Sequence, residues 1–440
     1  MKNKWLIAGS LIVILVLLFA AIVYYTWQGV SRARQDGVRW RAFSYDIVSA
    51  EADEEQRFPI SGPAALDIQN DIGNITVLVG AEDEIVITAH KTAWGINQAN
   101  AGAALERMKI ITSQIEDTVT VRVEPLDTVD VFAFRARPDS AVFTITVPAD
   151  TNVTVRSNAG DITVSDINDN ARLHTNFGEV SVKNTQGSLA VDTTSGRITA
   201  QNVQADGQTI DLESEFGSIA LEQANASVLV LSSNSGALDL EDIVVTGKIN
   251  LRSEFGSIHF VSGSADMLSI EANSGSIHLE DLEIVEPLNS RTEFGDITLS
   301  NVNAPAYDLE SNSGNVRLDR VQGTVKAHSE FGDIEVTDGE QVTLDLRTNS
   351  GTVTYSGSLG VGPHSLETEF GNIQLTIPEE TDLSVVLETE FGRVKSDLVI
   401  SLGGEFSERK LAGTINGGGE LLTASTNNGN ITISILNAKE

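Results

Sequence analysis

One glycine returns at a nearly constant interval through the second two thirds of the chain. Its successive positions are separated by 18 to 21 residues. These glycines are Gly160, Gly178, Gly196, Gly217, Gly236, Gly256, Gly275, Gly295, Gly314, Gly332, Gly351, Gly371 and Gly392. The second residue after each is Ile, Val or Leu, and apolar residues alternate with polar ones before it. A fixed period is typical of repeat architectures, and the alternation predicts a unit of strand, glycine turn and strand with one buried face.

The turns that end at these glycines alternate between two types. Asn-Phe-Gly or Glu-Phe-Gly ends at Gly178, Gly217, Gly256, Gly295, Gly332 and Gly371, and Thr-Ser-Gly or Asn-Ser-Gly ends at Gly196, Gly236, Gly275, Gly314 and Gly351. Counting alternate positions places Phe216 on the side of Leu212, and Ser235 on the side of Leu231. We therefore expect the phenylalanine rings to be buried, each above and below a small hydroxyl, which would fill the core without collisions between rings.

Two polar columns indicate how the units are arranged. Four residues before the glycine, successive units carry Arg252, Glu271, Arg291, Glu310, His328, Arg347 and Glu367. Two residues before it they carry Glu215, Asn234, Glu254, Asn273, Glu293, Asn312, Glu330, Asn349 and Glu369. If each unit lies on the preceding one, opposite charges mostly meet and amides separate the carboxylates. This pattern favours a parallel β-solenoid over an antiparallel meander, and it leaves handedness and oligomeric state open.

The beginning of the chain predicts a membrane anchor within residues 1–27. Residues 6–25 contain no charge and are long enough to cross a bilayer as a helix, with tryptophan and tyrosine at the ends. The alternative is a cleaved signal peptide, whose apolar region is shorter and ends at a small-residue cleavage site that is missing here. Four arginines directly after the apolar segment argue for a cytoplasmic body by the positive-inside rule.

The remaining chain divides into three predicted parts. Residues 28–60 have no clean apolar period and predict a polar linker. Residues 61–150 predict a β-rich N-terminal cap with one helix near residues 97–114. Residues 151–440 predict the solenoid domain. The fold class is therefore all-β: a parallel β-solenoid (β-helix) of about 19-residue rungs, with that cap, preceded by a single transmembrane helix.

Composition excludes several functions. The chain has 440 residues, a formal net charge of −33 and no cysteine. A disulfide scaffold, a thiolate metal site and a cysteine nucleophile are excluded. Nucleic-acid binding is disfavoured because phosphate contacts need a basic surface.

Three segments resemble a known bacterial family. They are FTITVPADTNVTVRSNAGDITV (residues 143–164), the recurrent S-G-x-[IV]-x-[LV] unit, and KLAGTINGGGELLTASTNNGNITI (residues 410–433). The chain is similar, over residues 61–440, to the β-strand-repeat putative adhesins of unknown function, relatives of autotransporter adhesin head domains. The resemblance implies a surface-associated, non-enzymatic β-solenoid, in some members tied to envelope stress responses. It supplies no functional residues, and it favours an extracytoplasmic body.

Two clusters are candidates for metal binding. His259 and His278 occupy the same outward column on neighbouring units, and imidazole pairs bind transition metals; however, no third ligand falls in this column. Glu367, Glu369, Glu388 and Glu390 share two columns near the end of the repeats, and such oxygens suit calcium. A solvated surface is the favoured interpretation of both clusters, so we assign no catalytic, cofactor-binding or metal residue and expect no cofactor.

The sequence therefore predicts a single-pass cell-membrane protein whose rod acts as an adhesin-like binding or scaffold protein. Its expected partners are the lipid bilayer, through the N-terminal helix, and a surface polysaccharide or another envelope protein. One alternative is an envelope-stress sensor that acts through a membrane partner. The second is a carbohydrate-active β-helix enzyme; the nearly constant rung length argues against it, because it leaves no long loops to wall a groove.

Overall fold

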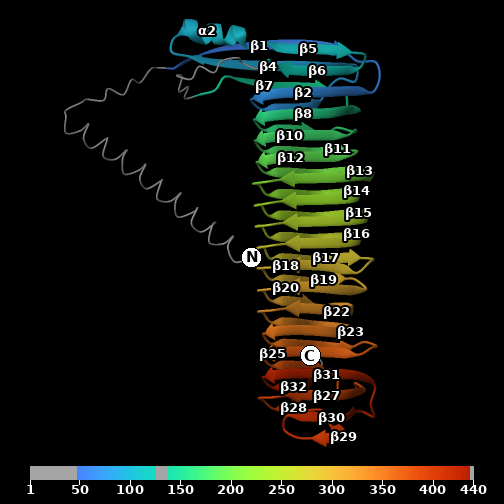
Figure 1. The fold of residues 1–440 in the computed structure, drawn as a ribbon. Coiled ribbons are helices and arrows are strands. Elements are labelled where there is room, and N and C mark those ends of the chain that lie inside the picture. Colours follow the sequence, from blue (N-terminus) through green and yellow to red (C-terminus); the bar gives the residue numbers. More distant parts are fainter. Residues whose placement is uncertain (1–46, 125–136, 437–440) are drawn as a thin grey trace, which may run out of the picture. The chain divides into compact units, whose positions relative to one another are not determined.

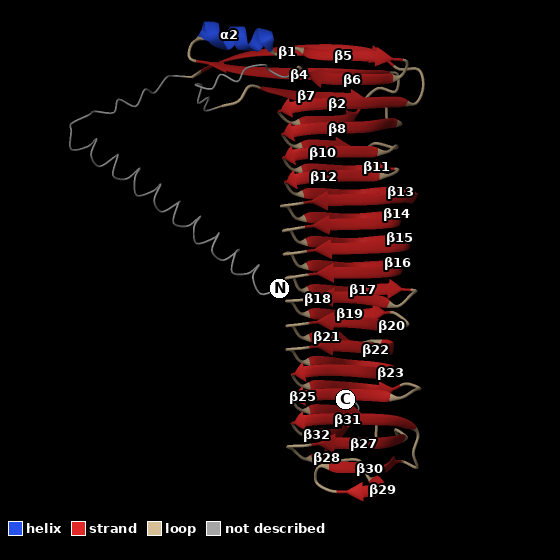
Figure 2. Ribbon diagram, in the orientation of Figure 1, coloured by secondary structure: helices blue, strands red, loops and turns tan. Residues whose placement is uncertain are grey.

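Strands stacked in parallel dominate the protein (Figure 1). The structure, a computed structural model, describes residues 47–124 and 137–436. From Gly160 to Gly371, each repeat lies on the preceding one with the predicted offset, so that Leu231 pairs with Leu251 and Arg252 pairs with Glu271. The predicted parallel β-solenoid is confirmed. Figure 2 shows that strands make up almost all of the described chain, with a single short helix.

The elements of the first part are one helix and nine strands. They are β1 (Val48–Pro59), β2 (Ala64–Ile72), β3 (Ile75–Val79), β4 (Glu84–Gly95), α2 (Gln98–Arg107), β5 (Ile110–Ile115), β6 (Thr118–Val123), β7 (Ser140–Val147), β8 (Thr151–Ala159) and β9 (Ile162–Ser165).

The elements of the repeats are all strands. They are β10 (Ala171–Phe177), β11 (Val180–Gln186), β12 (Leu189–Ser195), β13 (Ile198–Ser214), β14 (Ile219–Ser233), β15 (Leu238–Ser253), β16 (Ile258–Ala272), β17 (Ile277–Ile284), β18 (Leu288–Thr292), β19 (Ile297–Asn303), β20 (Ala306–Ser311), β21 (Val316–Asp319), β22 (Gln322–Ser329), β23 (Ile334–Ser350), β24 (Val353–Leu359), β25 (His364–Phe370) and β26 (Ile373–Ile377). The last part contains β27 (Leu383–Thr389), β28 (Val394–Ser396), β29 (Ile400–Phe406), β30 (Lys410–Ile415), β31 (Glu420–Asn428) and β32 (Ile431–Ile435).

The stack begins earlier than the repeat pattern suggested. β2 pairs in parallel with β8, and β3 pairs in parallel with β9, so residues 64–79 already form a rung. Beyond this rung, β4 pairs antiparallel with β7, and β5 pairs antiparallel with β6. Part of the predicted polar linker is wrong: residues 48–59 form β1, which pairs with β4. Alternate side chains of β1 are exposed, which explains its polar sequence.

The predicted helix is present but shorter than expected. It starts after Asn97, whose side-chain oxygen accepts a hydrogen bond from the backbone N–H of Asn100 at 2.9 Å. It ends at Arg107, and residues 110–115, whose Ile111 and Ile115 were counted toward the predicted helix, form β5 instead. Ala101 and Ala104 are its buried residues. Short apolar runs are ambiguous between helix and strand when only spacing is considered.

The core is one continuous column of branched apolar side chains. Positions such as Ile219, Leu229 and Leu238 have no exposed surface, and the cluster extends from Ile60 to Ile433. Because neighbouring strands lie about 4.8 Å apart, each apolar side chain packs against the equivalent residue in the rungs above and below.

The repeated glycines lie on one another at a tight turn. A Cβ atom added to Gly256 would lie 1.9 Å from the carbonyl oxygen of Gly236, and one added to Gly275 would lie 2.0 Å from that of Gly256. The requirement therefore comes from close approach of the preceding rung, and φ is not positive at Gly256 or Gly275. Any side chain here would separate two rungs.

A buried serine or threonine three residues before the glycine closes the same corner in most rungs; before Gly275 this position is Ala272. The Ser253 hydroxyl donates to the Gly236 carbonyl at 3.1 Å, and its oxygen accepts from the Gly256 N–H at 2.9 Å. Equivalent hydroxyls donate to the glycine carbonyl of the preceding rung from Ser214, Ser233, Thr292, Ser311, Ser329, Thr348 and Thr368. These bonds satisfy carbonyl groups that the turn would otherwise bury without a partner.

The stacking order departs from chain order at the end of the repeats. β31 pairs in parallel with β25 on one side and with β27 on the other. A Cβ added to Gly429 would lie 1.8 Å from the Gly371 oxygen, and one added to Gly392 would lie 1.9 Å from the Gly429 oxygen. The rung of Gly429 is thus inserted between those of Gly371 and Gly392, although these two glycines follow each other directly in the repeat pattern.

The predicted membrane anchor, residues 6–25, lies outside the described residues. Within the described ranges, no helix has both the length and the apolar character needed to cross a bilayer.

Candidate functional site

The predicted burial of the phenylalanine column is wrong. The side chains that precede the turn glycine are more than half exposed, with values from 58% to 68%. They are Phe177, Phe216, Phe255, Phe294, Phe331, Phe370 and Phe391, and we call this column the phenylalanine edge. The residues at the same position in the intervening rungs are Ser195, Ser235, Ser274, Ser313, Ser350 and Asn428, and we call them the spacer residues.

The turn explains why counting alternate positions failed. β13 ends at Ser214, which is the last inward-facing residue before the turn. Glu215 and Phe216 follow in a bend, and their N–H groups donate to the carbonyls of Thr193 and Thr194 in the preceding rung, each at 3.0 Å. The alternation of a strand does not continue through a bend. The small hydroxyl at Ser214 fills the corner, and the ring points to solvent.

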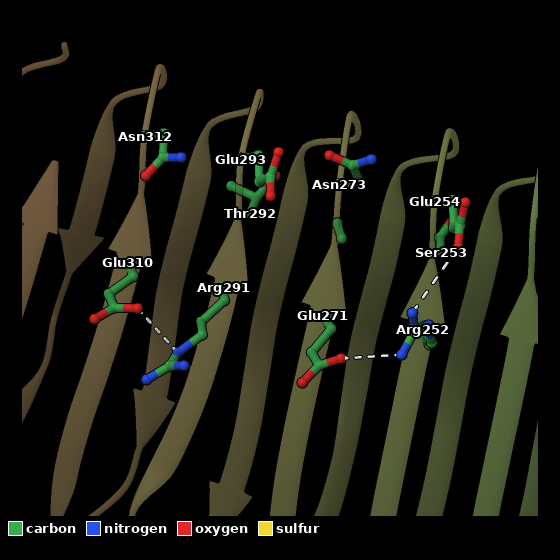
Figure 3. A pocket seen from close by; sticks show the side chains of 11 residues that line it. Arg252, Ser253, Glu254, Glu271, Asn273, Arg291, Thr292, Glu293, Glu310 and Asn312 are labelled. Atoms are coloured by element: carbon green, nitrogen blue, oxygen red, sulfur yellow. Dashed lines mark hydrogen bonds and ion pairs between the residues drawn. The ribbon is translucent and has the colours of Figure 1, made fainter. Parts of the chain in front are cut away.

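The two predicted polar columns precede these phenylalanines in each turn. Figure 3 shows both columns on four successive rungs. In the charge column, four residues before the glycine, Arg252 pairs with Glu271 at 3.4 Å and Arg291 pairs with Glu310 at 3.0 Å. Arg347 and Glu367 form a further pair at 3.0 Å. Exposed pairs of this kind stabilise a fold by only about 0–1 kcal/mol each. Their main effect is to fix the register of the rungs.

The amide–carboxylate column, two residues before the glycine, alternates as predicted. Glu254, Asn273, Glu293 and Asn312 line a hollow of about 420 Å³ together with the charge column (Figure 3). Each rung with a phenylalanine at the edge carries a glutamate here from Gly217 onward, and each rung with a serine spacer carries an asparagine from Gly236 onward. Phenylalanine at the edge therefore coincides with glutamate in the amide–carboxylate column, and serine coincides with asparagine.

The inserted strand β31 continues both alternations. In sequence, the last two turns are both Glu-Phe-Gly, which would place two rings and two carboxylates on adjacent rungs. In space, Asn428 pairs with Phe370, and the N–H of Phe391 donates to the Asn427 carbonyl at 2.9 Å. Asn427 thus lies between the rungs of Glu369 and Glu390, so like charges are separated.

The same insertion separates the glutamates considered for calcium. Glu367 and Glu388 both pair with Ser425, one from each side. Glu367 binds Arg347 at 3.0 Å, and Glu388 binds Lys410 at 3.3 Å. The four carboxylates do not gather at one point, so this cluster does not form.

The histidine pair lies in neighbouring rungs, as its shared column predicted. The ring centroids of His259 and His278 are 6.2 Å apart, in an edge-to-face arrangement. Each ring also contacts a carboxylate: His259 contacts Asp239 at 3.1 Å, and His278 contacts Glu280 at 3.4 Å. Among the described residues, no group of three or more histidine and carboxylate side chains is arranged to hold a metal ion.

Three buried titratable side chains form hydrogen bonds with backbone groups at the bends of the stack. The Tyr307 hydroxyl donates to the Val302 carbonyl at 2.6 Å, and that of Tyr355 donates to the Ser358 carbonyl at 2.6 Å. Burial raises the pKa of both tyrosines. His364 is 1% exposed, and its Nδ1 accepts from the Leu344 N–H at 3.3 Å. These groups fix corners of the stack.

Comparison with protein families identifies the chain. The family model described as Toastrack DUF4097 matches residues 65–281 and 261–434, which together span most of the sequence. The chain belongs to the Toastrack DUF4097 family. The resemblance to β-strand-repeat putative adhesins is thereby confirmed. The two matches cover one uninterrupted stack, because β16 and β17, which contain the overlap, pair in register.

Solved structures similar to this Toastrack protein are distant. A putative cell adhesion protein from Clostridium sporogenes is 7% identical, with 88% of this chain and 100% of that one covered and a TM-score of 0.18. A putative adhesin from Bacteroides fragilis is 14% identical over 65% and 96%, with a TM-score of 0.28. A putative lipid binding protein from Parabacteroides distasonis is 11% identical over 64% and 96%, with a TM-score of 0.27. At such scores these likenesses carry no argument. No curated protein matches the chain.

The buried side chain of His364 predicts that the folding stability of this Toastrack protein depends on pH. Burial lowers the pKa of His364, while a bond to Gly360 and the charge of Glu420 oppose this more weakly. The unfolded chain then binds a proton at His364 below about pH 6.5, whereas the folded chain does not. Folding stability should therefore fall as the pH decreases from about 6.5 towards the folded-state pKa.

The measurement compares thermal unfolding midpoints at pH 7.5 and 5.5 for wild type and His364→Gln. The amide oxygen of glutamine can still accept from Leu344, and it does not titrate. The wild type should lose more stability than the variant on acidification, since all other titrating groups are shared. Equal losses would show that His364 is not kept neutral by the fold.

Proposed function

We propose that this Toastrack protein is a membrane-anchored, adhesin-like binding protein whose body is extracytoplasmic and whose binding surface is the phenylalanine edge. The observation that carries this proposal is the exposure of seven phenylalanines at one offset in the repeat. Scattered single apolar residues are normal on a protein surface. A ring on every second rung, at a spacing of roughly 10 Å, is a periodic surface instead.

Because these rings are exposed, they do not contribute the folding free energy that their burial would provide. Full burial of one phenylalanine is favourable by about 1.5–3 kcal/mol. The spacer residues show that serine fits the same turn, so the turn itself does not require an aromatic residue. A partner that covers the rings would recover this free energy, and repeated weak contacts along one edge add through multivalency. A surface polysaccharide or an envelope protein would suit such an edge.

A non-enzymatic role agrees with how the titratable groups are used. The buried Tyr307, Tyr355 and His364 are each bonded to backbone at a corner. The charged residues near the phenylalanine edge form a ladder of ion pairs between successive rungs, on an exposed face. Membrane anchoring rests on residues 6–25, which contain no charged side chain.

The first test measures orientation and anchoring. Intact cells that produce the full chain are treated with an external protease, and the membrane fraction is then probed for the stack. We expect the stack to stay with the membranes before treatment and to be digested from outside. Full protection of the stack in intact cells would contradict the extracytoplasmic body.

The second test measures binding through the edge. Labelled full chain in detergent is added to cells, and bound protein is compared between wild type and the triple variant Phe255→Ser, Phe294→Ser, Phe331→Ser. Because serine occupies the same turn in alternate rungs, the variant should fold and should lose at least about tenfold in binding. The control replaces Val244, Val285 and Val361, which are exposed elsewhere, with serine. Unchanged binding by the phenylalanine variant would refute this function of the edge.

A further inference from the structure

We infer that the partner of the phenylalanine edge is a second copy of this chain, packed antiparallel so that the rings of each copy fit over the spacer residues of the other. This inference rests on the proposed function, because it names the occupant of the same edge. The shape of the edge, its amide–carboxylate column, its charge column and its exposed area support a second copy as the occupant.

The shape of the edge is complementary to itself. Each ring is followed by a turn with a small spacer, so a gap of two rungs, roughly 10 Å, separates successive rings. A ring of the second copy fits into this gap above a serine such as Ser274, which is exposed. The insertion of β31 preserves the gap between Phe370 and Phe391 by placing Asn428 there. Phenylalanine rings and gaps above the spacer residues thus alternate over the whole edge.

A displacement by one rung also matches the polar groups. The glutamates lie on the rungs of the rings, and the asparagines lie on the rungs of most spacers. When a ring faces a spacer, most of the glutamates therefore face an asparagine of the second copy, which can donate to them. Packing of ring on ring would instead bring glutamate against glutamate. The column that separates carboxylates within one stack separates them between two stacks as well.

Closed symmetry then requires an antiparallel pair. A twofold axis parallel to the stack would place every rung opposite the equivalent rung of the second copy. Each phenylalanine ring would then face the same ring of the partner. A twofold axis perpendicular to the stack, passing between two rungs, places rings over spacers and keeps both charge columns on the same side of the contact.

The charge column selects the position of this axis. With the axis between the rungs of Gly275 and Gly295, Arg291 lies beside the partner's Glu271, and Arg252 lies beside the partner's Glu310. With the axis between the rungs of Gly295 and Gly314, Arg252 would lie beside the partner's Arg347. On the four rungs nearest the axis, the first position brings opposite charges together at the rim of the contact, where they favour the correct register, so we assign the axis there.

The available area is sufficient for a stable pair. A phenylalanine offers roughly 200 Å² for burial, so the edge presents roughly 800 Å² of exposed ring surface. This is close to the ~800 Å² per partner of a standard interface. The chain carries a net charge of −33, but at physiological salt the repulsion between distant charges is screened beyond about 8 Å.

Spin labels test the arrangement. The chain has no cysteine, so Ser195→Cys, Ser274→Cys and Ser313→Cys each carry one label on the full-length protein in detergent. With the assigned axis, the two labels at position 274 lie one rung apart along the stack, and those at position 313 lie three rungs apart. The two labels at position 195 lie nine rungs apart, which is roughly 40 Å. We expect the label–label distance to increase in that order. Equal distances at all three positions or a minimum at 313 would overturn the inference, and so would a monomeric unlabelled wild type in the sedimentation experiment below.

The occupant is tested separately from the function. Sedimentation of the full chain in detergent should show dimers for the wild type and for the valine control variant, and monomers for the triple phenylalanine variant. In the cell-binding assay, cells that carry the chain should bind at least tenfold more labelled protein than cells that lack it. Equal, phenylalanine-dependent binding to both would refute the second copy as partner and leave the binding function standing.

Discussion

Gly256→Ala is expected to destabilise the rungs on both sides of the substitution by about 3 kcal/mol, at the upper end for overpacking. A Cβ at this position would lie 1.9 Å from the Gly236 carbonyl oxygen and 2.4 Å from its carbon. Neither group can move without breaking the pairing of β15 with β16. Because each rung contacts only its neighbours, the damage should be local. Amide hydrogen exchange is the appropriate measurement, with faster exchange expected across residues 238–272.

The matched control is Gly102→Ala in α2. No atom lies within 4 Å of an added Cβ there, and alanine has a helix propensity about 1 kcal/mol better than glycine. This variant should be as stable as the wild type or more stable. If Gly256→Ala also exchanged like the wild type, the glycine-on-glycine contact would not determine the spacing of the rungs.

Ser253→Ala is expected to cost about 2 kcal/mol, because it leaves two backbone groups of a buried corner without their side-chain partner. The hydroxyl donates to the Gly236 carbonyl and accepts from the Gly256 N–H. The side chain is 1% exposed, so water cannot replace it. Thermal unfolding and exchange of the Gly256 amide measure the loss.

Ser253→Thr is the conservative counterpart. Threonine occupies the same position at Thr292, where its hydroxyl donates to the Gly275 carbonyl at 3.0 Å. This variant should stay within about 0.5 kcal/mol of the wild type. A loss equal to that of Ser253→Ala would mean that the corner depends on side-chain volume rather than on the two hydrogen bonds.

Stacking was predictable because equal offsets in the sequence become neighbours in a solenoid. The prediction that Arg252 pairs with Glu271 needed only the repeat length and the signs of the charges, and the structure confirms it. The histidine pair was placed in neighbouring rungs by the same argument. In contrast, the exposure of Phe216 depends on where β13 ends, and an alternation count contains no information about a bend. The available signal was the position of the ring directly before the turn glycine.

The end of the stack shows a second limit. Glu367 and Glu388 appear adjacent if rungs follow chain order, yet β31, from more than thirty residues later, lies between them. The insertion was not proposed from the sequence, although Asn428 and Gly429 carry the same turn pattern as the repeats. Local pattern specifies that a segment can form a rung. Which gap the rung fills is decided by long-range pairing.

By itself, the sequence determined the repeat, the parallel stacking, the register of the charge column and the family, since each follows from periodicity and side-chain type. Only the tertiary structure decided that the rings face solvent, that β1 and the rung of residues 64–79 extend the stack, and that β31 is inserted near its end. The reason is that turn geometry and strand insertion depend on contacts between distant backbone groups, which a pattern of apolar and polar residues does not encode.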